Sequence, residues 1–182
     1  MISLGLDSGS SMTKAVLLED MKIIDTKMIP TSISPRKSLE ALYREIKKQH
    51  KEIDVIVTTG YGRNLLDQAD FKITEITCHA AGAFFMNPDC DTIIDIGGQD
   101  SKVITIDDLG CVESICQRTA AFAQKLAPAN PKVFFSGGLA QFDVIKRSLA
   151  SHLGVKEVAT DSLCQYTGAI GAAVLGIRKI KR

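Results

Sequence analysis

The sequence of 182 residues contains no tryptophan, few other aromatic residues, and no excess of charge of either sign. A net charge of +1, with the charges mixed along the chain, creates no field of the kind that recruits nucleic acid. No apolar run approaches the roughly 20 residues of a membrane span, and the N-terminus lacks the basic-then-apolar order of a signal peptide. We therefore expect a cytoplasmic protein that binds neither nucleic acid nor a membrane.

Regularly spaced pairs of cysteine are lacking. The chain has five cysteines, namely Cys78, Cys90, Cys111, Cys116 and Cys164. An odd count without any C-x-x-C pair signals neither a disulfide framework nor a compact zinc site. We expect reduced thiols, as is usual inside the cell.

One short pattern occurs twice. The first copy places Asp7 and Gly9 between two apolar segments, and the second copy does the same with Asp95 and Gly97. In each copy a lysine follows the aspartate by seven residues. A single Asp-x-Gly is a frequent hairpin turn, but its repetition in one register favours function. Two such hairpins, aimed at one cleft, can hold the phosphates of a nucleotide and its metal ion.

Apolar spacing and turn residues predict the elements around these hairpins. We expect strands at 2–7, 12–19, 23–29 and 53–58, a helix at 39–46 capped by Ser38, a helix at 76–86, the second hairpin at 91–107, a helix at 114–126, a strand at 132–136, and helices at 139–153 and 167–176. This order indicates an α/β half followed by a shortened relative of itself, with the halves at 1–90 and 91–182.

The first turn suits a phosphate group. Ser8, Gly9, Ser10 and Ser11 offer hydroxyl and N–H groups without a large side chain in the way. Lys14 follows in the returning strand, where it either neutralises the phosphate charge or lies at the rim. We predict that these residues bind the phosphates.

Two later glycine turns complete the predicted nucleotide site. Gly97 and Gly98 form the counterpart of the first turn. Gly137 and Gly138 lie between a strand and a helix, where their backbone would lie against the adenine or the ribose, with Gln141 nearby.

The two acids carry the predicted chemistry. Asp7 and Asp95 end their strands, where carboxylates can hold Mg²⁺ through water or orient an attacking water. Gln99 or Asp100 is positioned to place the nucleophile. We predict Asp7, Asp95 and Gln99 as catalytic residues.

Three further polar residues keep two interpretations each. Arg63 either reaches a phosphate or partner surface, or stabilises its own turn. Glu75 and His79 are four residues apart on a predicted helix, and they form either an ion pair or proton relay, or a structural pair. No third ligand stands near them in the sequence, so we expect no metal there.

Six blocks of sequence, in this order, resemble the ATPase activators of 2-hydroxyacyl-CoA dehydratases and the related benzoyl-CoA reductase subunits. They are LGLDSGS at 4–10, TGYGRN at 59–64, EITCHA at 75–80, IDIGGQDSKV at 94–103, SGGLAQ at 136–141 and QYTGAIGAA at 165–173. The resemblance implies two ribonuclease-H-like halves of the acetate and sugar kinase, heat-shock chaperone and actin superfamily, the second half shortened. It also implies ATP and Mg²⁺ bound by the turns, hydrolysis coupled to movement of the halves, and a CoA-substrate dehydratase or reductase-like partner.

The chain departs from this family in one segment. Family activators carry, after the second hairpin, several dozen residues with two cysteines that hold a [4Fe–4S] cluster between the subunits of a homodimer. Here Cys111 and Cys116 lack that glycine-rich context. We therefore expect no [4Fe–4S] cluster, although two thiols per subunit leave a four-thiolate site across a homodimer open.

Three classes of function follow. The first is an ATP-hydrolysing activator that engages a CoA-substrate enzyme, and the second is a nucleotide-binding regulatory module without catalysis. The third, a small-molecule kinase, would need an acceptor-binding segment between the hairpins, and the sequence offers none.

Overall fold

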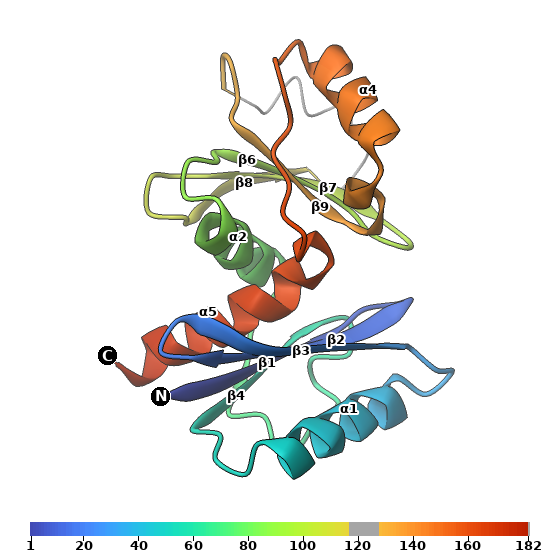
Figure 1. Ribbon diagram of the computed structural model, residues 1–182, viewed down its shortest axis with the longest axis vertical. Coiled ribbons are helices and arrows are strands. Elements are labelled where there is room, and N and C mark those ends of the chain that lie inside the picture. Colours follow the sequence, from blue (N-terminus) through green and yellow to red (C-terminus); the bar gives the residue numbers. More distant parts are fainter. Residues whose placement is uncertain (117–127, 182) are drawn as a thin grey trace. The chain divides into compact units, whose positions relative to one another are not determined.

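The computed structural model describes residues 1–116 and 128–181, and these fall into two compact units (Figure 1). Unit 1 comprises Met1–Gly82 and Gly168–Arg182, and unit 2 comprises Ala83–Thr167. The halves expected from the sequence were 1–90 and 91–182. The last helix, α5 (Thr167–Ile180), is grouped with unit 1 because it packs on the first strand. The helix α2 (Glu75–Met86) crosses from unit 1 into unit 2.

Unit 1 is built on a five-stranded sheet in the order β3-β2-β1-β4-β5. Its strands are β1 (Ile2–Ser8), β2 (Met12–Glu19), β3 (Lys22–Pro30), β4 (Val55–Gly60) and β5 (Phe71–Lys72). The first three form the predicted antiparallel meander, and β4 and β5 continue the sheet in parallel. The sequence did not predict β5, because two residues give no periodic signal.

The residues of β1 alternate between two helices on opposite faces of this sheet. Leu4 and Leu6 belong to the apolar cluster under α1 (Pro35–Gln49). Ser3, Gly5 and Asp7 point to the other face, which α5 covers (Figure 1). A β-carbon on Gly5 would lie 2.0 Å from a carbonyl oxygen of α5, so only glycine allows this close approach.

The helix α1 begins earlier than predicted. Pro35 stands in its first turn, where a missing N–H costs nothing, and the N-cap residue is Ser34. Ser38 therefore lies inside the helix and is not its cap. Its hydroxyl oxygen accepts a hydrogen bond from the N–H of Ser32 at 2.8 Å and thus fixes the loop before the helix.

Unit 2 contains a four-stranded sheet in the order β8-β7-β6-β9. Its elements are β6 (Thr92–Ile96), β7 (Ser101–Ile106), β8 (Val112–Cys116), β9 (Val133–Gly137), the short 3-10 helices η2 (Gly138–Gln141) and η3 (Cys164–Tyr166), and the helix α4 (Asp143–Leu153). α4 packs on β6 and β9 through the cluster around Ile94, Phe135 and Leu149.

Two predictions for unit 2 need correction. The helix expected at 114–126 is wrong at its start, because residues up to Cys116 continue β8, antiparallel to β7. The rest of that prediction, 117–127, lies outside the described residues. The helix expected at 139–153 is divided at Phe142, whose extended backbone separates η2 from α4.

The two sheets repeat one plan. β6 pairs with β7 antiparallel and with β9 parallel, as β1 pairs with β2 and β4. β8 takes the place that β3 has in unit 1. Within residues 1–116 and 128–181, no helix is long and apolar enough to cross a membrane.

Candidate functional site

Each unit carries the same pair of charged residues at the end of its central strand. Asp7 lies opposite Lys14 in the β1–β2 register, and Asp95 lies opposite Lys102 in β6–β7. The carboxylate-to-ammonium distances are 3.7 Å and 3.5 Å. Both aspartates are buried, at 3% and 4% exposure. The predicted duplication is confirmed at the level of atoms, and the lysines neutralise the two buried carboxylates.

The two hairpin turns close in the same way. The N–H of Gly9 donates to the carbonyl oxygen of Met12 at 3.2 Å, and the N–H of Gly97 donates to that of Asp100 at 2.9 Å. These glycine N–H groups are therefore used inside the turns. The residues at the tips, which remain exposed to solvent, are Ser10, Ser11, Gly98 and Gln99.

A glycine with positive φ is the last residue of the neighbouring parallel strand in both units. Gly60 (φ 81°) lies beside Ser8, and Gly137 (φ 91°) lies beside Ile96. A β-carbon on Gly60 would lie 2.5 Å from Oδ1 of Asp7, and one on Gly137 would lie 2.2 Å from the carbonyl oxygen of Ile96. We had not predicted Gly60 as a site residue. The sequence does contain a signal for it, because a glycine ends each of the two strands that run parallel to an Asp-bearing strand.

Hydroxyl groups lie next to both carboxylates. In unit 2 the hydroxyl of Ser136 donates to Oδ1 of Asp95 at 2.5 Å. In unit 1 Thr59 stands at the matching position beside Asp7. Among the described residues, the buried hydroxyl of Ser8 has no hydrogen-bond partner. Such an orphaned polar atom is uncommon in folded proteins, and here it lies at the predicted phosphate site.

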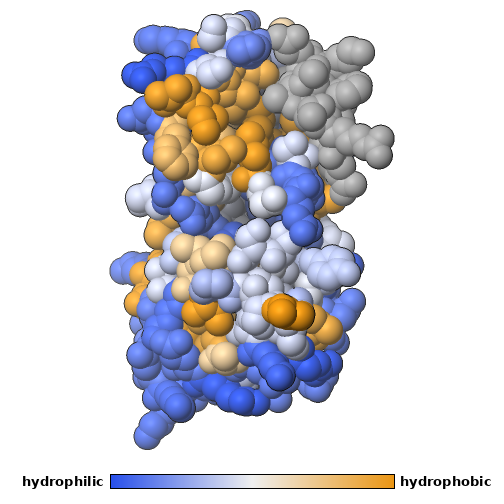
Figure 2. Space-filling model, turned by 90° about the vertical axis from the view of Figure 1, so that its right-hand side faces the viewer, coloured by the Kyte–Doolittle hydropathy of each residue, from blue (hydrophilic) through white to orange (hydrophobic). Residues whose placement is uncertain are grey.

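The third predicted turn opens onto apolar surface. Gly138 is exposed, and among the described residues nothing lies within 4 Å of a β-carbon built on it. Gln141 is exposed three residues later. Leu139, Phe142 and Val144 expose 39%, 57% and 70% of their surface. Figure 2 looks at the side that carries η2 and α4 in Figure 1 and shows apolar surface over this part of unit 2. The turn is therefore followed by apolar side chains that water does not favour.

The structure selects one of the interpretations for Arg63. Its backbone N–H and its guanidinium both donate to the carbonyl oxygen of Gly60, each at 3.3 Å. Arg63 thus stabilises the turn that lies over Asp7.

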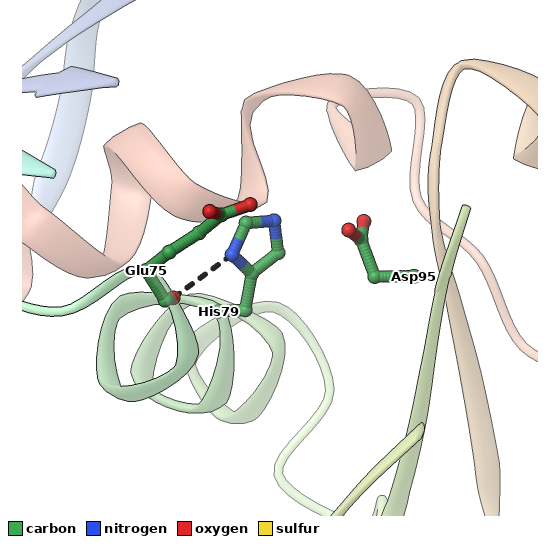
Figure 3. A group of neighbouring side chains, drawn as sticks. All are labelled: Glu75, His79 and Asp95. Atoms are coloured by element: carbon green, nitrogen blue, oxygen red, sulfur yellow. Dashed lines mark hydrogen bonds between the residues drawn. The ribbon is translucent and has the colours of Figure 1, made fainter. Parts of the chain in front are cut away.

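His79 and Glu75 contact each other through the backbone of α2 (Figure 3). Nδ1 of His79 lies 2.9 Å from the carbonyl oxygen of Glu75. A carbonyl can only accept, so Nδ1 carries the proton and the tautomer is fixed. Asp95, also drawn in Figure 3, comes from β6 of unit 2.

The cysteines differ in exposure. Cys78, Cys90 and Cys164 are buried and pack within the protein. Burial raises the pKa of the Cys78 thiol to about 12 and that of the Cys90 thiol to about 11. Cys111 is exposed in the loop before β8.

Relatives of this chain are known. Residues 4–113 match the model of the BadF/BadG/BcrA/BcrD ATPase family. An activator of lactoyl-CoA dehydratase from Anaerotignum propionicum is 41% identical over 117 residues, which are 62% of this chain and 45% of that protein. The chain thus spans less than half of this relative. An (R)-2-hydroxyglutaryl-CoA dehydratase activating ATPase from Acidaminococcus fermentans is 26% identical over 255 residues and 97% of each chain.

That second alignment is longer than the 182 residues of this chain. Because it covers nearly all of both proteins, the relative must carry internal residues without a counterpart here. The sequence therefore represents a shortened form.

Solved structures share the fold. Component A of the (R)-2-hydroxyglutaryl-CoA dehydratase of Acidaminococcus fermentans superimposes with a TM-score of 0.88 at 23% identity over 100% of both chains. An activator of 2-hydroxyisocaproyl-CoA dehydratase from Clostridium difficile with bound ADPNP gives 0.82 at 24% identity, covering 100% of this chain and 96% of that one. A glucokinase of the ROK family from Streptomyces griseus gives 0.66 at 12% identity, covering 98% and 100%.

These likenesses confirm the predicted fold class, two α/β halves folded as in activator ATPases and sugar kinases. The family match covers more than half of the residues and includes both Asp-Gly hairpins. The chain belongs to the BadF/BadG/BcrA/BcrD ATPase family.

Proposed function

We propose that this protein binds ATP with Mg²⁺, hydrolyses it, and couples the nucleotide state to a partner enzyme that acts on a CoA ester. One observation carries the proposal. The arrangement of a buried aspartate, its cross-strand lysine and a neighbouring positive-φ glycine occurs once in each unit. Such a duplicated arrangement is what a nucleotide needs if its phosphates are to be held from two sides.

The donor groups of the site fit a magnesium–phosphate ligand. Asp7 and Asp95 supply carboxylate oxygens, which Mg²⁺ prefers, through water. Ser8 supplies a buried hydroxyl without a partner among the described residues. When bound, the metal ion would offset the negative charge of the phosphates. The proposed phosphate ligands in unit 1 are Ser8, Ser10, Ser11 and Lys14, on the turn that Gly9 forms.

The second unit supplies the remaining proposed contacts. Gly97 would form the turn that presents the backbone of Gly98 to the phosphates, and the exposed side chain of Gln99 would orient the attacking water. Gly138 and Gln141, followed by the apolar side chains of η2 and α4, suit the adenine and the ribose.

The partner is proposed from the relatives. Several of them are named as activators of CoA-substrate dehydratases, and one is named as a subunit of benzoyl-CoA reductase. This chain is shorter than the activating ATPase of Acidaminococcus fermentans, and its Cys111 and Cys116 lack the family's cluster motif. We therefore propose that it holds no [4Fe–4S] cluster, whether or not it forms a homodimer.

Turnover of ATP tests the catalytic part. We expect Mg²⁺-dependent hydrolysis in the full chain and a loss of about 100-fold or more in Asp95→Asn, which keeps the size of the side chain. Asp89→Asn, an exposed change in the same unit, is the matched control and should hydrolyse ATP normally. Tight ATP binding without turnover would instead indicate the regulatory module. Absence of both binding and turnover would refute the nucleotide proposal.

Iron analysis after strictly anaerobic purification tests the redox part. A colourless protein without iron is expected. A brown protein with iron at about two atoms per chain, half of a [4Fe–4S] cluster shared by a dimer, would overturn this part and leave the nucleotide site intact.

A further inference from the structure

The turn from Thr59 to Asn64 rests directly on the proposed phosphate site of unit 1. The position of a β-carbon on Gly60 is 2.5 Å from Oδ1 of Asp7, and that on Gly62 is 2.2 Å from Oγ of Ser8. The N–H of Gly62 donates to the carbonyl oxygen of Ser8 at 3.2 Å. Both glycines of the turn thus touch a residue that we assign to the nucleotide.

The hydroxyl of Ser8 is the part of this contact that a bound nucleotide would change. The hydroxyl of Ser8 is buried against Gly62 and has no hydrogen-bond partner among the described residues. A buried hydroxyl without a partner costs free energy, so a phosphate oxygen that accepts a hydrogen bond from it would draw this group toward itself. The surface that supports Gly62 would then change.

Hydrogen bonds within the turn hold it together, so it would move as a rigid unit. The N–H and guanidinium of Arg63 donate to the carbonyl oxygen of Gly60, and the hydroxyl of Thr58 donates to that of Arg63 at 2.7 Å. The N–H of Leu65 donates to Gly62 at 2.9 Å. A shift at Gly62 is therefore passed to the residue between the two glycines.

That residue is Tyr61, which exposes 85% of its surface. Its neighbours Gly60 and Gly62 are both buried. Among the described residues, no hydrogen bond ties the Tyr61 side chain to the rest of the protein. The aromatic ring is thus free to follow the backbone of the turn.

We propose that the turn Thr59–Asn64 is a nucleotide-responsive element that transmits the occupancy of the Asp7–Ser8 site to Tyr61 at the surface. This inference rests on the proposed nucleotide function. A ligand shifts such an element only by its differential affinity for the two positions, and the hydroxyl of Ser8 supplies that difference. Because such coupling acts equally in both directions, a mutation that immobilises the turn must also alter the affinity of the site for the nucleotide.

The chain offers a clean reporter for the test, because it contains no tryptophan. Tyr61→Trp places a single indole at the tip of the turn. Its emission and its quenching by acrylamide are measured with and without ATP and Mg²⁺, while calorimetry measures how much nucleotide is bound. We expect about a twofold change in the quenching constant at saturation.

Two variants complete the experiment. Tyr43→Trp, on α1, is the matched control and should show no change at the same occupancy. Ser8→Ala in the Tyr61→Trp background should lose most of the response at saturating nucleotide, with circular dichroism to confirm the fold.

The outcomes separate this inference from the proposed function. Nucleotide binding by calorimetry with an unchanged indole at position 61 would overturn the transmission and leave the proposed function standing. An unchanged response in Ser8→Ala would overturn the assigned route. Absence of nucleotide binding in the unmodified chain would overturn both.

Discussion

At the scale of single residues, adjacent glycines have different tasks. Gly137 has φ of 91° and faces the backbone of Ile96, so its lack of a side chain is required for folding. Among the described residues, nothing lies within 4 Å of a β-carbon built on Gly138. A side chain there would meet no internal contact among these residues, and the proposed role of this glycine is to let a ligand approach.

The first prediction compares these two positions. Gly137→Ala should lower the free energy of unfolding by about 3 kcal/mol or more, because strain at positive φ adds to a backbone clash. Gly138→Ala should change the stability by less than about 0.5 kcal/mol but weaken ATP binding about tenfold. Denaturant unfolding and calorimetry measure the two effects. Gly154→Ala, at φ of 69° in open space, controls for strain alone. Normal ATP affinity in Gly138→Ala would refute the ligand role.

The second prediction concerns thiol reactivity. The pKa values of about 12 for Cys78 and about 11 for Cys90 keep these thiols protonated below pH 9, and Cys164 is buried as well. Because only a thiolate reacts readily, iodoacetamide at pH 8 should label Cys111 alone. A Cys116→Ser background removes the one cysteine whose side chain is not described.

Mass spectrometry counts the labelled thiols in that background. We expect one in the native protein, and four after unfolding in guanidinium. Raising the pH from 7 to 9 should leave Cys78 and Cys90 unlabelled. Labelling of either buried thiol in the native state would contradict the described packing.

At the scale of elements, the sequence predicts hairpins well and boundaries poorly. Both Asp-Gly hairpins form in the predicted register because alternation of apolar residues and the turn glycines agree. The start of α1 was misplaced because Ser38 has the chemistry of a cap but bonds back to Ser32 from inside the helix. The sequence alone does not distinguish these two uses of one hydroxyl.

The missed strand β8 has a different cause. Residues 114–116 were assigned to the start of a helix, although the repeat itself implied a third strand equivalent to β3. The contacts of Gly60 with Asp7 could not be predicted either, because they join segments more than 50 residues apart through parallel pairing of β1 and β4. Only the pairing of strands brings these glycines to the site.

A third prediction belongs to the helix α5. Its Gly171 lies against the backbone of α2, and a β-carbon there would stand 1.7 Å from the carbonyl oxygen of Cys78. Replacing glycine by alanine inside a helix normally stabilises by about 1 kcal/mol. Gly171→Ala should instead destabilise by about 3 kcal/mol or more, because two backbones must separate.

Chemical unfolding measures the sign of this change. The exposed Arg178→Ala in the same helix is the matched control and should alter the stability by less than about 0.5 kcal/mol. A stabilising effect of Gly171→Ala would mean that α2 and α5 do not pack this closely.

At the scale of the whole molecule, the chain leaves unit 1 at Gly82 and returns at Gly168, so unit 1 holds both termini. Contacts between residues that are far apart in the sequence hold the returning segment, α5, on the first sheet. The hydroxyl of Ser3 donates to the carbonyl oxygen of Ala173 at 2.7 Å in a buried position, and Gly176 packs on Val55 and Val57. Unit 2 has a core of its own around Ile94, Phe135 and Leu149.

The fourth prediction follows from this unequal dependence on α5. Removing residues 168–182 should expose the face of the first sheet that carries Ser3, Gly5 and Asp7, and unit 1 should lose cooperative folding while the sheet of unit 2 persists. Hydrogen exchange should show β1 and β4 losing protection by about 100-fold or more, with β6 and β9 changing much less. Removing only residues 181 and 182, beyond the end of α5, is the control and should leave both sheets protected. Equal loss in both sheets would mean that the two cores fold as one cooperative unit, whereas unchanged protection of β1 would mean that α5 does not stabilise unit 1.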